Sequence, residues 1–237
     1  MLTLALDTTT RGGSASLSDD VRTLAVVPGD AARTHGERLP GDLAQALQDA
    51  GRSLADVALL AVAHGPGAFT GIRIGLACMQ GLAVTTGRPV VGVSALEALA
   101  YGHSRRQMPV RMGVCMDAGR GEAFLQWFRR DPTSAWGLTP LTPPEVLVVE
   151  AVTPPRVSEV DGLCVLCGDA APGLGAHLGG PWRIAHEAGP LAPSVAALAR
   201  WQWHADADPR RWTPDALEPL YVRRPDVEVT REARLQS

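Results

Sequence analysis

Lysine is absent from this sequence, because all 22 basic residues of the 237-residue chain are arginines. This absence excludes three chemistries that depend on a lysine amine. A P-loop uses its lysine to reach the phosphates, and a protein kinase uses the lysine of its third strand. Schiff-base and pyridoxal-phosphate enzymes use a lysine nucleophile. The chain therefore belongs to none of these classes.

Cysteines and histidines are too few and too scattered to predict a metal site. Cys78 and Cys115 stand alone in apolar surroundings, as buried thiols commonly do. Cys164 and Cys167 have C-x-x-C spacing, but their apolar run is typical of a strand, where residues three apart point to opposite faces. No two histidines are two, three or four residues apart, so neither a helix nor a strand presents a metal-binding face. We predict no bound metal.

Long apolar runs are also missing. The longest uncharged stretches, such as 57–72, are interrupted by glycine and proline, which predicts no transmembrane helix and no membrane partner. The N-terminus lacks the basic and apolar regions of a signal peptide. We therefore expect a cytoplasmic protein.

The charge balance is slightly acidic. The net charge is −3, with 46% hydrophobic and 20% charged residues, as in ordinary globular proteins. Such a chain is unsuited to bulk electrostatic binding of nucleic acid. Arginine pairs at 105–106, 129–130, 210–211 and 223–224 are either solvated surface or local RNA contacts.

Hydrophobic patterning predicts an α/β fold. Up to residue 103 the predicted order is β-β-β-α-β-α-β-α, which favours a mixed sheet with an antiparallel meander, parallel strands and flanking helices. The predicted strands cover 2–6, 14–18, 23–27, 57–63, 89–93, 112–116 and 122–128, and the predicted helices cover 39–50, about 71–86 and 95–101. Further candidates for strands or helices are 143–152, 163–167 and 194–205.

An internal duplication divides the chain. A strand, an aspartate, a turn and a second strand occur at Asp7 and again at Asp117. We predict an N-terminal lobe over 1–106 and a smaller C-terminal lobe over 107–189. A helix at about 190–210 is expected to pack back on the first lobe, and the charged tail, 223–237, is expected to fray.

The strongest local signal is the glycine-rich segment from His64 to Gly75, which follows a buried strand and opens a helix. Backbone N–H groups bind anions in this setting. The spacing is one residue off the dinucleotide fingerprint, and no acidic residue follows at the ribose-binding distance, which disfavours a nicotinamide cofactor. The candidate nucleotide or anion loop comprises Asp7, Thr8, Thr9, Gly65, Gly67, Thr70 and Arg73.

Two features of this loop keep its interpretation open. Asp7 and the threonines after it also suit ordinary turn capping. In addition, Thr9 occupies the position where phosphate loops of this shape normally have glycine.

A stripe of small side chains follows in the next helix, at Gly71, Gly75 and Cys78. Such a stripe allows a second helix to approach closely. It could serve a partner protein or this chain's own sheet. The candidate partner interface comprises Leu39, Leu43, Leu47, Gly71, Gly75, Cys78 and Leu82.

The sequence leaves open two interpretations of the segment from His35 to Arg38. Its donors and acids suit a functional site. They equally suit the solvated start of a helix.

Several segments, taken together and in order, resemble the TsaB (YeaZ) family and span nearly the whole chain. They are Leu-Ala-Leu-Asp-Thr-Thr-Thr at 4–10, His-Gly-Glu-Arg-Leu at 35–39, Gly-Pro-Gly-Ala-Phe-Thr-Gly-Ile-Arg-Ile-Gly at 65–75, Gly-Val-Ser-Ala-Leu-Glu-Ala-Leu at 92–99, Asp-Ala-Gly-Arg-Gly-Glu at 117–122 and Pro-Leu-Tyr-Val-Arg at 219–223. The Gly-Pro-Gly segment is the most specific of them.

This resemblance implies two RNase H-like lobes of the actin-like ATPase and sugar-kinase (ASKHA) superfold. TsaB proteins are non-catalytic partners of a sister protein, TsaD, which makes N6-threonylcarbamoyladenosine in tRNA beside the anticodon. TsaD holds a metal through two histidines in an Asn-His-x-x-x-His segment. The corresponding positions here are Ala95 and Leu99, which cannot bind a metal. The resemblance therefore implies an activating and dimerising subunit without catalytic residues.

The resemblance also implies a set of partners. These are a TsaD-like catalytic subunit, a TsaE-like ATPase, tRNA through the complex only, and a second copy of the chain in isolation. ATP and Mg²⁺ are expected at the level of the assembled complex, and the sequence leaves open whether this chain itself binds a nucleotide. The alternatives are a stand-alone ASKHA-type small-molecule kinase or ATPase using Asp7 and the 65–71 loop, and an RNA-binding module using the arginine pairs.

Overall fold

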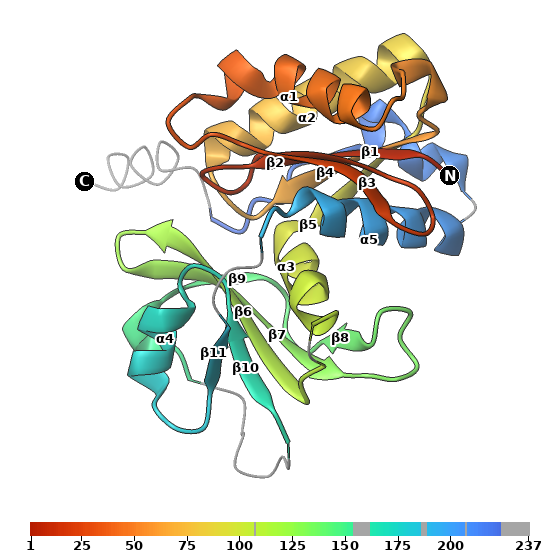
Figure 1. Ribbon diagram of the computed structural model, residues 1–237. Helices are drawn as coiled ribbons and strands as arrows, with labels where there is room; N and C mark the ends of the chain where they lie inside the picture. The colour runs from red at the N-terminus through yellow and green to blue at the C-terminus, as the bar shows by residue number, and fades with distance from the viewer. Residues whose placement is uncertain (107, 154–161, 186–188, 207, 224–237) are drawn as a thin grey trace.

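A computed structural model describes residues 1–106, 108–153, 162–185, 189–206 and 208–223 (Figure 1). Within them the chain forms two β-sheets, one above the other in Figure 1, with helices between the sheets and on their outer faces. The predicted tail lies outside the described residues except for Arg223.

The first sheet combines a meander with parallel strands, as the sequence predicts. Its described strands are ordered β3-β2-β1-β4-β5. β1 pairs antiparallel with β2 and parallel with β4, and β5 extends the parallel side. Helical crossovers are required between parallel strands, and the chain supplies one before β5. The bounds are β1 (Thr3–Asp7), β2 (Ser14–Ser18), β3 (Thr23–Pro28), β4 (Leu59–Gly65) and β5 (Val90–Ser94).

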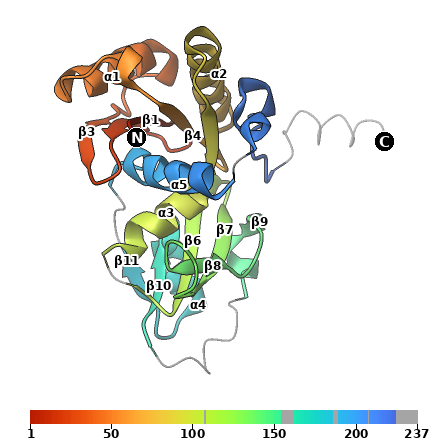
Figure 2. The same cartoon turned by 90° about the vertical axis from the view of Figure 1, so that its right-hand side faces the viewer.

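Four helices flank this sheet in two layers among the described residues. α1 (His35–Asp49) and α2 (Phe69–Thr86) cover its outer face. α3 (Ala95–Ser104) and α5 (Ala192–Ala205) lie against its other face, between the two sheets (Figures 1 and 2).

The predicted start of the first helix is wrong by four residues. Glu37 accepts from both the backbone and the side chain of Thr34, which forms a capping box and begins α1 at His35 rather than Leu39. Pro40 consequently lies inside the helix.

The second sheet has the order β11-β10-β6-β7-β8 within the described residues, and β9 also pairs with β7. α4 packs on its outer face. The bounds are β6 (Arg111–Gly119), β7 (Glu122–Arg130), β8 (Leu138–Pro140), β9 (Glu145–Val148), β10 (Cys164–Cys167), α4 (Ala171–Leu178) and β11 (Arg183–Ala185). Short 3-10 helices cover Leu54–Asp56, Val149–Ala151, Pro209–Trp212 and Pro214–Ala216.

The two sheets repeat one topology. β1 carries Asp7 at its end, and it pairs antiparallel with the next strand and parallel with a later one. β6 carries Asp117 near its end and has the same two kinds of neighbour, β7 and β10. The strand–aspartate–turn–strand match therefore corresponds to equivalent places in the two lobes. The residue boundaries of the lobes, 1–106 and 107–189, stay a prediction.

One hydrophobic core joins the lobes. Ala5 and Val93 of the first sheet belong to the same buried cluster as Met112 and Phe128 of the second. Residues of α3 and α5 fill the space between the sheets. Separate outer clusters pack under α1 and α2 and under α4. In the described part of the chain, no helix is long and apolar enough to cross a membrane.

Candidate functional site between the lobes

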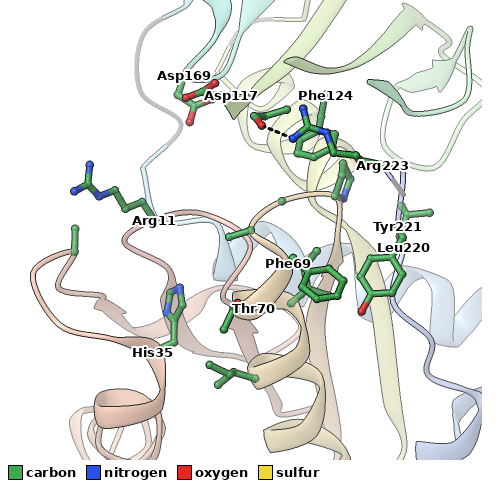
Figure 3. Close-up of a pocket in the computed structure, with 18 of the residues that line it drawn as sticks. Arg11, His35, Phe69, Thr70, Asp117, Phe124, Asp169, Leu220, Tyr221 and Arg223 are labelled. Atoms are coloured by element: carbon green, nitrogen blue, oxygen red, sulfur yellow. Dashed lines mark hydrogen bonds between the residues drawn. The ribbon is translucent and has the colours of Figure 1, made fainter. Parts of the chain in front are cut away.

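A cavity of about 990 Å³ opens between the lobes, and residues of both lobes line it (Figure 3). Arg11, Arg33 and His35 line it on the N-terminal lobe, together with the first turn of α2. Asp117 and Asp169 line it on the C-terminal lobe. Arg11 and Arg33 therefore line one wall and two carboxylates the opposite wall, where Arg223 also lies.

The carboxylate of Asp7 is hydrogen-bonded within its own turn. The Asp7 carboxylate accepts hydrogen bonds from the Thr9 N–H at 2.8 Å, the Thr9 hydroxyl at 2.6 Å and the Thr10 hydroxyl at 2.6 Å. Asp7 and Thr9 are buried, and neither lines the cavity. The carboxylate is thus engaged by its own turn, as in ordinary turn capping.

The glycine-rich loop packs tightly against this turn. The Ala68 N–H donates to the Thr9 carbonyl at 3.1 Å. A Cβ on Gly67 would lie 2.5 Å from the same carbonyl oxygen, and a Cβ on Gly65 would lie 2.5 Å from the Leu220 carbonyl oxygen. These two glycines are required because backbone approaches them closely and their φ angles are positive.

The small-residue stripe of α2 faces this chain's own Asp7 turn, which favours internal packing over a partner protein for Gly71 and Gly75. A Cβ on Gly71 would lie 2.1 Å from the Thr8 carbonyl oxygen, and one on Gly75 would lie 2.1 Å from the Thr8 hydroxyl oxygen. Leu39 and Leu43 are likewise buried in the core under α1 and α2. These four residues pack internally.

The remaining residues of the predicted interface are half-buried. Leu47, Cys78 and Leu82 pack against the edge of the same core. Burial raises the pKa of the Cys78 thiol. Their part in an interface stays a prediction.

The segment from His35 to Arg38 starts α1 with Gly36 and Glu37 exposed, as the helix-start interpretation predicts, but Arg38 itself is buried. Its guanidinium donates to the Gly12 carbonyl, pairs with Asp42 and contacts His35 Nδ1 at 2.8 Å. Because a guanidinium can only donate, His35 Nδ1 is the acceptor and the imidazole is neutral. Burial and the charge of Arg38 lower the pKa of His35 accordingly. Arg38 ties α1 to the Asp7 turn.

A pair of aromatic rings lines the cavity where α2 begins. The rings of Phe69 and Tyr221 stack with centroids 5.1 Å apart. Arg73 lies 4.0 Å above the Phe69 ring centre and donates to the Tyr221 hydroxyl at 2.8 Å. Arg73 is therefore held on the aromatic pair rather than in the cavity.

The segment after α5 connects the two lobes. The Leu220 N–H donates to the His64 carbonyl at 2.8 Å on the first lobe. Arg223 donates to the Ala118 carbonyl at 2.9 Å and pairs with Glu122 on the second lobe. Four consecutive residues of this segment, 220–223, line the cavity.

The structure brings together part of the predicted loop. Gly67 and Thr70 line the cavity, whereas Asp7, Thr8, Thr9, Gly65 and Arg73 lie behind or beside it. Most of the other lining residues are missing from the predicted set, among them Arg11, Phe69, Tyr221 and Arg223. The Pro-Leu-Tyr-Val-Arg match to the family at 219–223 includes Tyr221 and Arg223 and could have indicated these two.

The positions equivalent to metal-binding histidines lie in the shared core. Ala95 is fully buried and Leu99 is 7% exposed. Both belong to the cluster that joins the two sheets. Their aliphatic side chains pack where the resemblance would place the metal ligands.

The paired lobes of matching topology define the class of protein, an α/β protein of the ASKHA superfold. Component A of (R)-2-hydroxyglutaryl-CoA dehydratase from Acidaminococcus fermentans shares the fold, with a TM-score of 0.52 and 12% identity over 85% of this chain and 98% of that one. A protein from Pseudomonas aeruginosa, described as similar to the peptidase YeaZ, has a TM-score of 0.81 and 28% identity over 94% of this chain and 99% of its own.

Sequence comparison narrows the class to one family. The tRNA threonylcarbamoyladenosine biosynthesis protein TsaB of Escherichia coli is 30% identical over 94% of this chain and 95% of its own length. The chain belongs to the TsaB (YeaZ) family, in tRNA threonylcarbamoyladenosine biosynthesis. The model of the TsaD family, tRNA N6-adenosine threonylcarbamoyltransferase, also matches residues 17–134. The predicted family and superfold are both confirmed.

Proposed function

We propose that this chain is a non-catalytic subunit that binds and activates a TsaD-like threonylcarbamoyltransferase in the modification of tRNA beside the anticodon. The observation that carries the proposal is the pair of buried aliphatic residues, Ala95 and Leu99, at the positions of the transferase's metal ligands. An alanine methyl and a leucine side chain offer no donor to a metal. We place the complex in the cytoplasm.

We further propose that ATP and Mg²⁺ act in the assembled complex, which includes a TsaE-like ATPase, and not on this chain alone. The closed Asp7 turn supports this assignment, since its carboxylate already accepts three hydrogen bonds from the turn. The stand-alone kinase or ATPase would need that carboxylate near Mg²⁺.

The shared core supports a scaffold role. Two-lobed enzymes commonly close around a ligand by a hinge motion. Here α3 and α5 fill the space between the sheets in one buried cluster, so closure would disturb close packing. A rigid body suits a subunit that presents a fixed surface to its partner.

We assign the partner surface to the exposed face of α2 in place of its buried stripe. Phe69, Arg73, Ala77 and Val84 are exposed and follow one another at helical spacing. Phe69 is 39% and Val84 72% exposed, although both are large and apolar. The same face would pair two copies of this chain when the transferase is absent.

A reconstituted modification assay tests the proposal. Three mixtures each receive tRNA, ATP and the precursors of the threonylcarbamoyl donor. They contain the chain alone, the TsaD-like protein with the TsaE-like ATPase, and all three proteins. We expect no modified adenosine with the chain alone and strong stimulation when it joins the other two. The proposal would be contradicted if the chain alone modified the tRNA. It would also be contradicted if the other two proteins formed as much modified adenosine without the chain as with it.

A further inference from the structure

A second cavity lies at the outer edge of the first sheet and shares no lining residue with the cavity between the lobes. Its volume is about 510 Å³. Val90 and Gly92 of β5, the C-terminal end of α5 and the segment after α5 surround it. This size is in the range of cavities that hold small ligands.

Two indole rings contribute to its walls. Trp201 is 44% exposed, which is unusual for so large an apolar side chain. Trp212 is fixed by its Nε1–H, which donates to the Asp206 carbonyl at 3.2 Å, and by Trp203, whose ring centre is 6.2 Å away. Indole faces carry negative electrostatic potential and attract cations.

His64 adds a hydrogen-bond acceptor. Its Nδ1 lies 3.0 Å from the Glu218 carbonyl oxygen. Because a carbonyl only accepts, Nδ1 carries the proton and Nε2 keeps a lone pair in the neutral ring. Burial lowers the pKa of His64, which keeps the ring neutral near pH 7.

The carboxylates of Asp206 and Glu218 give the cavity an excess of acceptors. Arg211 pairs with Asp206 at 2.5 Å and lies 6.0 Å from the Trp212 ring centre. The chain thus already places one guanidinium between a carboxylate and an indole here. The carboxylate of Glu218 has no partner among the described residues.

We propose that this cavity binds an organic cation, an ammonium or guanidinium group, which Trp201 covers and which Glu218 and His64 accept in hydrogen bonds. Asp206 is already engaged by Arg211 and by the Asp208 N–H, so the acceptors left for a ligand are the exposed Glu218 carboxylate and one imidazole nitrogen of His64. Recognition of this kind is independent of the proposed function. The cation is carried either by a free polyamine or by a basic side chain.

Calorimetric titration of the full-length chain tests this site with spermidine, methylammonium and N-acetyl-arginine amide as probes, each of which carries N–H donors. We expect saturable binding of at least one probe. If spermidine is the only probe that binds, the cation comes from a free polyamine. If the arginine amide binds most tightly, the cation comes from a basic side chain. Glu218→Gln and Trp201→Ala should each weaken the binding about fivefold.

The matched control is Asp215→Asn, because Asp215 is exposed in the same segment but does not line the cavity. It should bind the probes as the unmodified chain does. Absence of binding by all three probes, or equal weakening by Asp215→Asn and Glu218→Gln, would overturn the proposal. Preferential binding of ATP or phosphate at Arg211 would overturn it as well. Thermal unfolding of each variant verifies that it is folded.

Discussion

At the residue scale, the contact between Thr8 and α2 governs how closely the helix approaches the Asp7 turn. Gly71 and Gly75 leave room for the Thr8 carbonyl and hydroxyl oxygens, respectively. A side chain at either position would collide with a buried part of the turn, because Thr8 is fully buried. The glycines are therefore packing residues of the N-terminal lobe.

Gly75→Ala should lower the free energy of unfolding by about 1–3 kcal/mol, because an added methyl overpacks a filled space. Gly81→Ala is the matched control in the same helix, where a Cβ would have open space around it. It should raise stability by about 0.5–1 kcal/mol through helix propensity. Urea unfolding of both variants measures the difference, and equal stabilities would contradict the packing.

Three histidines, one buried and two half-buried, should make the free energy of unfolding pH-dependent near neutrality. Burial is the first cause of the lowered pKa values of His35, His64 and His103. As the pH falls through the ordinary histidine pKa of about 6.5, the unfolded chain takes up protons that the folded chain does not. The stabilisation present above that pH is therefore lost as the pH falls towards the lower pKa of the folded state.

Urea unfolding at pH 7.5 and 5.5 measures this loss. His64→Gln should reduce the difference between the two values, because one of the three titrating groups is removed. Carboxyl groups with lowered pKa values, such as that of Asp131 at about 2, act at lower pH. Stability that stays constant or rises towards pH 5.5 would refute the histidine effect.

At the element scale, α1 and the Asp7 turn are held together by one buried guanidinium. Arg38→Ala should destabilise the chain by about 2–3 kcal/mol, because the Gly12 carbonyl and the Asp42 carboxylate would lose their donor. Arg33→Ala is the control, since Arg33 is exposed on the turn preceding the same helix. Its effect on chemical denaturation should stay within about 0.5 kcal/mol.

Local sequence signals predict most elements but not their exposed faces. The apolar run at 57–63 falls on β4, because a strand buried on both faces has apolar residues throughout. The alternation at 14–18 falls on β2, because successive side chains of a pleated strand point to opposite faces. The stripe of Gly71 and Gly75 allows close approach by any backbone. Its neighbour is Thr8, more than sixty positions away in the sequence, and spacing within a helix carries no information about it.

The candidate site was less predictable than the fold for the same reason. The Asp7 turn and the Gly67 loop are recognisable locally, and they do meet. Tyr221 and Arg223 reach the cavity only because the chain returns from α5 across both lobes. Side chains brought together by such long-range packing leave no common spacing in the sequence.

At the scale of the whole molecule, the two lobes form a single packed body with a cavity between them. The core shared by α3, α5 and both sheets fixes the lobes relative to one another. α2 lies in the outer layer of helices on the first sheet (Figures 1 and 2), and its residues Arg73, Ala77 and Val84 are exposed. This arrangement is what a docking subunit requires.

The affinity between this chain and the proposed TsaD-like partner tests the proposed function most directly. Isothermal titration should show a one-to-one complex that Ala77→Arg weakens at least about tenfold, because an arginine on the exposed face of α2 adds bulk and charge at the contact. The control is Val21→Arg, on the β2–β3 turn at a residue 91% exposed, which should bind as the unmodified chain does. Unchanged affinity in Ala77→Arg, or no complex with the unmodified chain, would contradict the account.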